Sequence, residues 1–256
     1  MRKDYFYLWY GISKTEIPTT ENRRKSSPKA IFLFFGLVLA LSIADISYAA
    51  PAYGTYMPEK QKWAWGTEAS FIIDRNLDND EGGTNGNRYF LTASYGLLSW
   101  ISLDGKIGFG NINWDRNRGD NLNYSTNFAG GYGFRIKGYE NEKQGIKSAV
   151  GFQHISVHPE AKNQAGDKNE VIIDEWQGSL VISKDIESIV PYIGARYGTL
   201  DFIRRTNEVD RKRIKSEENY GIIVGMDWWM NKSTKLNLEG TFLDGEELSF
   251  GISYAF

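Results

Sequence analysis

The sequence ends in the stretch Glu247-Leu-Ser-Phe-Gly-Ile-Ser-Tyr-Ala-Phe256, in which every second residue is apolar. Successive side chains of a β-strand point to opposite sides, so this alternation predicts a strand with one apolar face and one face of small residues. Terminal residues of soluble domains are often poorly ordered in water. The alternation therefore raises the question of which environment the apolar face meets.

The same alternation recurs along the chain and predicts ten strands of about ten residues, the length that a tilted strand needs to cross a bilayer. In the fifth segment the phase of the alternation is lost near His154, which predicts a β-bulge. The predicted strands span residues 63–74, 88–97, 101–110, 127–139, 146–157, 171–183, 189–201, 219–229, 235–242 and 247–256.

The second face of these segments combines Gly, Ser, Asn and Thr with single charges of both signs. The outer face of a soluble sandwich would instead be rich in long, solvated side chains. Small residues fit the inside of a narrow barrel, and opposite charges can pair across it, since an unpaired buried charge is costly. The apolar face then points into lipid, where a closed barrel pairs every backbone group. The charges expected in the lumen are Glu68, Arg88, Asp104, Lys106, Arg135, Glu175, Arg196 and Glu239.

The connections between the predicted strands alternate between long and short, although the last outer turn is short. Outer-membrane barrels have this arrangement, with short turns on the periplasmic side and longer loops outside. Aromatic residues are expected in two belts at the membrane interfaces. These are Trp63, Trp65, Trp100, Tyr139, Trp228 and Phe256 near the short turns, and Trp114, Tyr124, Tyr197 and Tyr220 near the long loops.

Residues 59–256 resemble the small outer-membrane β-barrel proteins of Gram-negative bacteria. In that group a terminal Phe, preceded by apolar residues at alternate positions, is the sorting signal that the barrel assembly machinery reads. The resemblance implies an all-β, ten-stranded antiparallel up-and-down transmembrane barrel in the cell outer membrane. Its implied partners are outer-membrane lipid, lipopolysaccharide and the assembly machinery. The positions that match the signal are Leu248, Phe250, Ile252, Tyr254 and Phe256.

The N-terminal region has the three parts of a secretory signal peptide. Basic residues lead into an uncharged apolar run from Ala30 to Ala44, and the small residues Ser47 and Ala49 follow. The run is shorter than the ~20 residues of a spanning helix, so cleavage is expected after Ala49. The predicted division is a cleaved signal peptide at 1–49, a short periplasmic segment at 50–58 and the barrel at 59–256.

The composition excludes several classes of protein. The chain has no cysteine, which excludes disulfides and thiolate metal sites. It carries 30 Lys and Arg against 32 Asp and Glu, so it lacks the basic excess of a nucleic-acid-binding protein. Aromatic residues make up 14% of the chain and there are 27 glycines, which favours strands and tight turns over helices.

One motif bears on catalysis. His154-x-Ser156 resembles the His-x-Ser of outer-membrane lipid A deacylases, which also carry a Glu farther along the chain, here Glu160 or Glu170. Those enzymes have Asn after the Ser and this chain has Val157, which favours a structural His and Ser at the barrel rim. The omptins, ten-stranded surface proteases with acidic and His residues on extended outer strands, are a second enzymatic alternative. This chain offers only two histidines.

A polar connection after the first strand has acidic residues at the spacing of calcium ligands. The EF-hand pattern also requires Gly at the sixth position and Glu at the twelfth. Asn79 and Asn85 occupy those positions, so a solvated acidic loop without a metal is expected. The residues concerned are Asp74, Asn76, Asp78 and Asp80.

A second connection is basic and would lie beside an outer leaflet of phosphorylated lipopolysaccharide. Cationic side chains form strong, charge-assisted hydrogen bonds with phosphate oxygens. Contact with lipopolysaccharide is therefore expected at Arg204, Arg205, Arg211, Lys212, Arg213 and Lys215.

The sequence thus predicts a non-enzymatic outer-membrane barrel without a cofactor. Its role would be structural, adhesive or that of a narrow pore, and the alternative is a lipid A deacylase-like or omptin-like enzyme. A barrel of ten strands is near the size at which side chains fill the interior. The lumen charges are therefore expected to pair into a plug.

Overall fold

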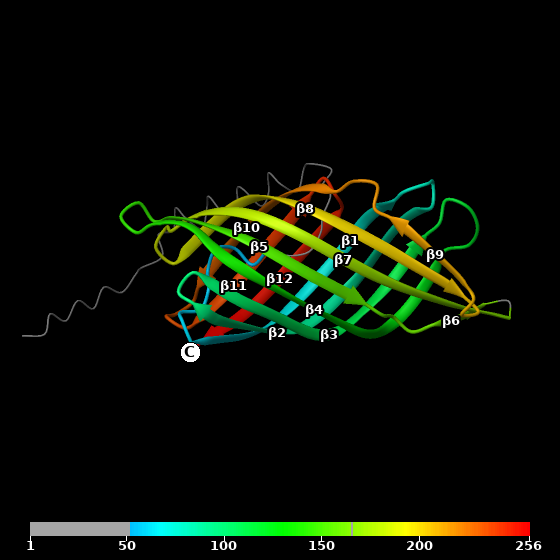
Figure 1. Cartoon of the computed structure of the whole chain (residues 1–256), viewed down its shortest axis with the longest axis horizontal. Helices are drawn as coiled ribbons and strands as arrows, with labels where there is room; N and C mark the ends of the chain where they lie inside the picture. The colour runs from blue at the N-terminus through cyan, green and yellow to red at the C-terminus, as the bar shows by residue number, and fades with distance from the viewer. Residues whose placement is uncertain (1–51, 165) are drawn as a thin grey trace, which may run out of the picture.

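The computed structural model describes residues 52–164 and 166–256, and the regular structure in this part of the chain is β throughout (Figure 1). The predicted signal peptide at 1–49 lies outside the described residues. The strands are β1 (Trp63–Leu77), β2 (Gly82–Leu98), β3 (Ile101–Asp115), β4 (Leu122–Asn141), β5 (Ile146–Val157), β6 (Lys162–Gln164), β7 (Asp167–Lys184), β8 (Ile189–Thr206), β9 (Asp210–Lys215), β10 (Tyr220–Trp229), β11 (Thr234–Phe242) and β12 (Glu246–Ala255).

The strands form one closed antiparallel barrel. Most strands pair with their sequence neighbours, and β1 pairs with β12 to close the sheet. β5 and β6 both pair with β7, while β9 and β10 both pair with β8. The twelve segments therefore make ten strands, two of them interrupted, and the predicted ten-stranded antiparallel barrel is confirmed.

Alternation sorts the side chains of each strand between two environments. Tyr89, Phe109 and Phe128 lie opposite one another on β2, β3 and β4 and are exposed on the outside. Arg88 and Arg135, on the other face of the same sheet, are buried inside. The outside of the barrel is therefore apolar where the inside is polar.

Within the described residues, no helix is long and apolar enough to cross a membrane.

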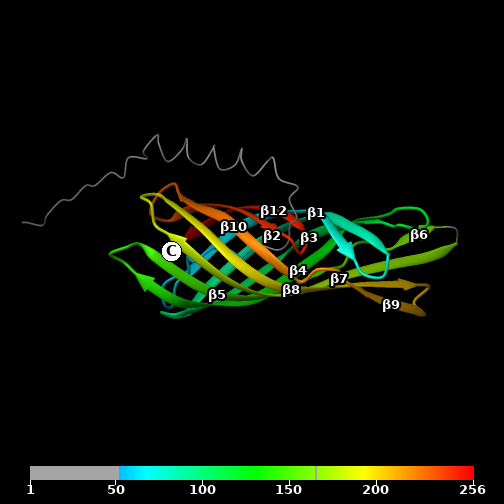
Figure 2. The same cartoon turned by 90° about the horizontal axis from the view of Figure 1, so that it is seen from above.

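Several strands are longer than the apolar alternation predicts. β1 runs on to Leu77 and β2 begins at Gly82, so the expected long loop between them is a hairpin with a short turn. The basic connection is likewise a hairpin, in which β8 continues to Thr206 and pairs with β9. Figure 2 shows β6 and β9 at the same end of the barrel. We call this end the hairpin end and the opposite one the short-turn end.

The bulge predicted near His154 is wrong. β5 keeps an unbroken register with β7 from Ile146 to Val157. The apolar phase changes because the interior becomes apolar toward the hairpin end, where Ile155 and Val157 point inward and are buried.

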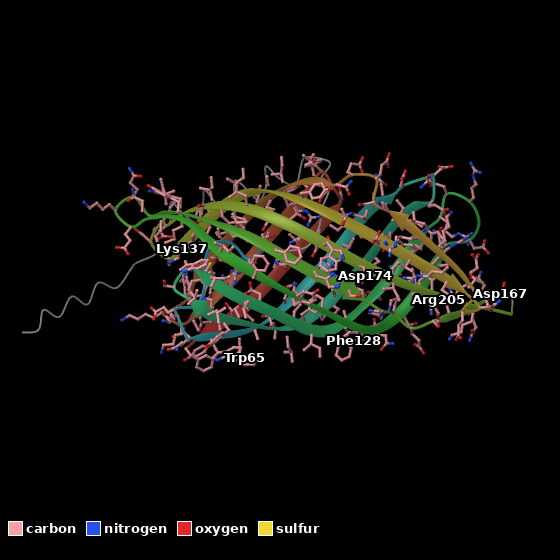
Figure 3. All side chains as sticks on the ribbon, viewed as in Figure 1. Trp65, Phe128, Lys137, Asp167, Asp174 and Arg205 are labelled. Atoms are coloured by element: carbon pink, nitrogen blue, oxygen red, sulfur yellow. The ribbon has the colours of Figure 1, made fainter. Side chains whose placement is uncertain are left out.

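The aromatic belt is as expected at the short-turn end and partly wrong at the other. Trp65 is exposed near the short turns (Figure 3), and Tyr197 and Tyr220 are exposed on the outside toward the hairpin end. Trp114 and Tyr124 were also expected in a belt, but both are buried inside the barrel. They belong to an apolar layer that fills the interior there.

Candidate functional site

A charged cluster fills the middle of the barrel, and Arg88 on β2 lies at its centre. Its Nη1 is 3.2 Å from Oε2 of Glu175 on β7, and its Nη2 is 2.5 Å from Oε2 of Glu247 on β12. The guanidinium also donates to Oγ of Ser70 at 3.0 and 3.1 Å. All of these side chains are buried. Arg88 therefore links β2 to β1, β7 and β12 across the lumen.

Glu175 extends this cluster to the other side of the barrel. Besides Arg88, it contacts Nη1 of Arg75 at 3.4 Å and Nη2 of Arg196 at 3.6 Å. Arg196 also forms a 2.6 Å ion pair with Asp244 and donates to Oε1 of Gln177. A single buried carboxylate thus faces three guanidinium groups, which offsets the cost of burying each charge.

A second set of ion pairs lies toward the short-turn end. Nζ of Lys106 is 3.2 Å from Oε1 of Glu68. Arg135 holds Asp104 in a two-point contact of 2.7 and 2.9 Å, the geometry of a strong guanidinium-carboxylate pair. Lys235 and Asp227 pair at 2.9 Å across β10 and β11 and are also buried.

The segment 52–58 enters the barrel at the short-turn end and packs on these charges. Nη1 of Arg135 donates to the carbonyl oxygen of Tyr56 at 2.6 Å. Nζ of Lys106 lies 4.7 Å from the ring centroid of Tyr53, a cation-π distance. Burial and the Glu68 carboxylate raise the pKa of Tyr53 well above its usual range, so its phenol stays protonated. The segment therefore occupies the mouth of the barrel.

Close packing holds the start of this segment. Gly54 adopts a φ of +64°, and a Cβ at this position would meet the ring of Tyr192 at 3.0 Å. Tyr192 in turn donates its hydroxyl to Glu239, which also accepts the backbone N–H of Ala52. Only glycine combines that backbone conformation with so little space.

An apolar layer fills the interior toward the hairpin end. Trp114 and Phe202 pack with ring centroids 5.0 Å apart, and both are buried. The indole N–H of Trp114 donates to the carbonyl oxygen of Glu81 at 2.9 Å. The layer comprises Leu77, Phe90, Ile112, Trp114, Leu122, Tyr124, Ala129, Ile155, Val157, Val171, Ile173, Leu200, Phe202 and Ile214.

The lumen charges named from the sequence all lie inside the barrel but do not form one network. Arg88, Glu175 and Arg196 join the central cluster. The other five lie toward the short-turn end, at Glu68, Asp104, Lys106, Arg135 and Glu239.

The lumen charges named from the sequence leave out five charges that are buried. Asp227, Lys235 and Glu247 are in phase with the inward face of their strands, so alternation alone could have found them. Arg75 and Asp244 lie in stretches expected to be connections. Because the alternation is defined only within the predicted strands, it does not predict which way a residue of a connection points.

The C-terminal positions that match the assembly signal lie on the outer face of the closing strand. Phe250 is opposite Ala69 of β1, and the backbone N–H of Phe256 donates to the carbonyl oxygen of Trp63 at 3.0 Å. Leu248, Ile252 and Tyr254 lie on the same face as Phe250, at every second position of the strand. The apolar face of the final strand thus meets lipid at the seam.

The six basic residues named from the sequence divide between the two faces of the β8–β9 hairpin. Lys212 pairs with Glu81, and Arg204 lies 5.8 Å from the ring centroid of Trp114. These two cover the apolar layer. The strand periodicity places the other four on the outer face, at Arg205, Arg211, Arg213 and Lys215.

Acid partners neutralise part of the outer face of this hairpin. Arg213 lies 3.3 Å from Asp201, and Arg205 lies 3.8 Å from Glu170. Arg211 and Lys215 are exposed beside them. The outer face of the hairpin therefore retains a net positive charge.

His154 and Ser156 both point outward on β5, but they do not contact each other as nucleophile and base. His154 stacks on Trp176 with ring centroids 4.0 Å apart. Oγ of Ser156 instead lies 2.8 Å from Nε2 of His158 and donates to Oδ1 of Asp174 at 2.5 Å. In a catalytic triad the carboxylate orients the histidine, whereas this carboxylate contacts the serine.

The acidic stretch between β1 and β2 does not converge on a cation. Asp80 contacts Arg118 and Asn117, and Asp78 accepts the backbone N–H of Asn79. No group of three or more acidic or histidine side chains in the described residues has the arrangement of a metal site.

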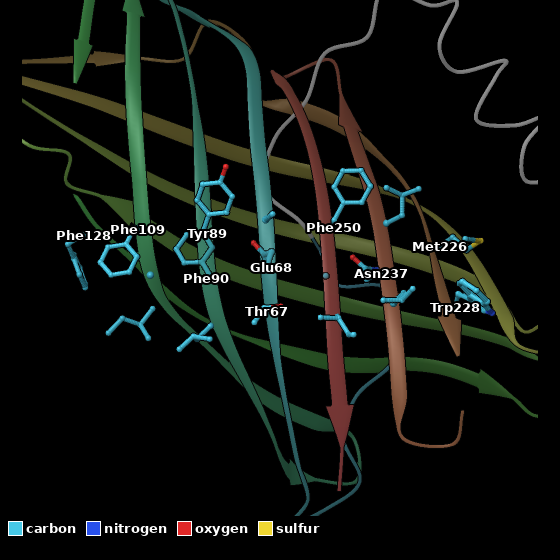
Figure 4. A pocket seen from close by; sticks show the side chains of 18 residues that line it. Thr67, Glu68, Tyr89, Phe90, Phe109, Phe128, Met226, Trp228, Asn237 and Phe250 are labelled. Atoms are coloured by element: carbon cyan, nitrogen blue, oxygen red, sulfur yellow. The ribbon is translucent and has the colours of Figure 1, made fainter. Parts of the chain in front are cut away.

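Two hollows differ in position and size. The interior one lies beside Tyr53, Glu68 and Arg135 and has a volume of about 60 Å³, room for about two water molecules. The larger one, about 980 Å³, lies on the outside between apolar side chains of β1–β4 and β10–β12, including Phe250 and Trp228 (Figure 4). It is part of the apolar outer wall.

Comparison with known proteins gives no match to a protein-family model and none to a curated protein. Among solved structures, the chain is similar to an outer membrane channel from Pseudomonas putida F1, with 9% identity, TM-score 0.43, and coverage of 81% of this chain and 100% of that one. It is also similar to outer membrane protein OprG from Pseudomonas aeruginosa, with 9% identity, TM-score 0.40, and coverage of 79% and 99%.

The outer membrane protease OmpT from Escherichia coli is a third similar structure, with 12% identity, TM-score 0.38, and coverage of 80% of this chain and 100% of that one. These proteins include a channel and a protease, so no activity is transferred from them to this chain.

The architecture of the chain itself identifies its environment. A closed barrel with an apolar outside and an even number of antiparallel strands satisfies its backbone in lipid, and bacterial outer-membrane proteins are built in this way. The protein is an integral β-barrel of the outer membrane.

Proposed function

We propose that the protein is a plugged, non-enzymatic barrel that acts through its outer surface and does not conduct solutes. The observation that carries the proposal is the filled interior. Segment 52–58, the buried ion pairs and the apolar layer follow one another along the barrel axis. Open aqueous channels belong to barrels of about sixteen strands and more.

Purified protein in a planar lipid bilayer is expected to show no steady ion conductance. The reason is that ions would have to pass both the paired charges and the dry layer around Trp114. Single-channel recording tests this, with a sixteen-stranded porin in the same bilayer as the positive control. Folded protein is verified by its faster migration on a detergent gel before boiling. A steady, large conductance from the folded protein contradicts the proposal and favours a narrow pore.

The second part of the proposal is that the outer face of the β8–β9 hairpin contacts lipid phosphates. Lys215 lies in register with Asp201 on β8, and Asp201 lies opposite Asp174 on β7, two residues beyond the lipid-facing Trp176. Two residues of strand span about 6–7 Å. The exposed cations therefore begin at the level where acyl chains give way to charged headgroups.

Replacing Arg211, Arg213 and Lys215 together by serine is expected to weaken binding to phosphorylated lipid A about tenfold in low salt. The loss follows from removing charge-assisted contacts to phosphate, and it shrinks as salt screens them. Titration of detergent-folded protein with fluorescent lipid A measures it. Lys143→Ser with Lys232→Ser, at the short-turn end, is the matched control. Equal binding of dephosphorylated lipid A by the unmodified protein would contradict phosphate contact.

The geometry around Ser156 supports the non-enzymatic part of the proposal. Asp174 contacts the Ser156 hydroxyl, whose oxygen also lies 2.8 Å from Nε2 of His158. The ring of His154 stacks on Trp176, with Tyr132 tilted beside it. An acyl hydrolase needs a base that the carboxylate orients toward the nucleophile. The described contacts fit a network that fixes β5 to β7.

A further inference from the structure

Asparagines cover the outer faces of β2, β3 and β4 at the hairpin end. They take alternate, outward-facing positions on each strand, and each of their side chains is either half-buried or exposed. Apolar residues of the interior layer lie behind them, including Ile112, Trp114 and Tyr124. We call this surface the asparagine face, and it consists of Asn85, Asn87, Asn111, Asn113 and Asn123.

The asparagines are in register and partly bonded to one another. Asn85, Asn113 and Asn123 lie opposite one another across the three strands. Nδ2 of Asn113 donates to Oδ1 of Asn85 at 2.8 Å, and Nδ2 of Asn85 donates to Asp115 at 2.7 Å. Each amide has two donors and an acceptor oxygen. The ladder thus orients the amides and leaves hydrogen-bonding capacity directed away from the barrel.

The asparagine face is continuous with the lipid-facing wall. The row Tyr89, Phe109 and Phe128, labelled in Figure 4, lies next to it along the strands. The exposed fractions of these three side chains are 50%, 63% and 47%. Asn87 and Asn111 are each two residues farther along their strands, about 6–7 Å. The amides therefore begin where the acyl chains of the surrounding lipid end.

We propose that the asparagine face binds the saccharide part of outer-leaflet glycolipid. The inference rests on the outer-membrane placement stated above and concerns a surface separate from the basic hairpin. Amide groups both donate and accept hydrogen bonds, as sugar hydroxyls do. No lysine or arginine belongs to the face, so its chemistry fits neutral sugars better than phosphate. A lipid whose acyl chains lie on the aromatic row places its sugars against these amides.

Replacing Asn85, Asn113 and Asn123 together by alanine tests the proposal. Binding of the detergent-folded protein to lipopolysaccharide that carries its core saccharide is expected to weaken about tenfold, since each lost hydrogen bond has a modest net effect. Binding to lipid A without the saccharide is expected to stay unchanged. Asn231→Ala, which removes an exposed amide at the short-turn end, is the matched control and should change neither.

The hairpin variant without Arg211, Arg213 and Lys215 separates this inference from the proposed function. It should lose affinity for both lipids, whereas the alanine variant loses affinity only for the one with sugars. Unchanged binding of the core-bearing lipid, or an equal loss for both lipids, overturns the saccharide proposal while leaving the hairpin result standing.

Two further measurements test the proposal if the triple variant does not fold or if a second copy of the chain covers the face. Asn123→Ala removes a side chain that takes no part in the bonds from Asn113 to Asn85 and from Asn85 to Asp115, so it should fold even if the triple variant does not. A selective loss of two- to threefold is expected. No selective loss in this folded variant overturns the proposal. Concentration-dependent dimers of the unmodified protein that Asn123→Ala abolishes would also overturn it, because a second copy would then occupy the face.

Discussion

Replacement of Arg88 by alanine is expected to lower the free energy of unfolding by about 3–5 kcal/mol. The substitution removes the cation between Glu175 and Glu247 and leaves the Glu247 carboxylate in contact with the Ser70 hydroxyl but without its ion-pair partner. Breaking one side of a buried ion pair is costly because the remaining charge stays out of water. Urea titration of the detergent-folded protein, followed by tryptophan fluorescence, measures the loss.

Two comparisons identify the cause of this loss. Arg118→Ala removes an arginine that is 87% exposed and paired with Asp80 at the surface, so it should cost no more than about 1 kcal/mol. Arg88→Leu combined with Glu247→Leu removes both charges and should be more stable than Arg88→Ala alone. If the double variant is less stable than the single one, the unpaired carboxylate is not the source of the loss.

Replacement of Trp114 by alanine is the second large effect, with an expected loss of about 3–5 kcal/mol. The side chain is 1% exposed and packs on Phe202. Its indole also lies 5.0 Å from the Arg116 guanidinium. The hairpin end should lose stability while the rest of the barrel keeps it. The reason is that the charged clusters, which hold the membrane-spanning part together, lie below the apolar layer.

Trypsin cleavage distinguishes local from global loss. Trp114→Ala should speed cleavage at Arg211 and Lys212 in the β8–β9 hairpin. The barrel itself should stay folded and still migrate faster on a detergent gel before boiling than after. Trp176→Ala is the matched control, since this indole is 40% exposed on the lipid-facing side. Equal cleavage rates in the two variants would show that the apolar layer does not hold the hairpins.

The sequence predicts the barrel well because lipid imposes a strict two-residue period. Phe250 and Leu91 must face outward wherever acyl chains surround the wall, and charges such as Arg88 then face inward. Beyond the membrane this constraint ends. Strands continue on backbone hydrogen bonds, and an interior core reverses the apolar phase at Ile155 and Val157.

The candidate sites were less predictable, because partner choice depends on the three-dimensional arrangement. Alternation places Arg196 inside, but not beside Asp244, which lies in a turn. The six clustered cations of the sequence predict one basic surface. In the hairpin, however, Lys212 pairs with Glu81 and Arg213 pairs with Asp201. The asparagine face emerges only when three strands align in register.

The contact between Ala52 and Glu239 has a consequence for the order of assembly. The two residues are 187 positions apart, so Ala52, which precedes β1 in the chain, reaches this contact only after β11 is in place. Contacts between residues so distant in sequence form slowly, because the chain must first give up much of its freedom. Docking of Ala52 on Glu239 is therefore expected to be a late event, after β11 has joined the sheet.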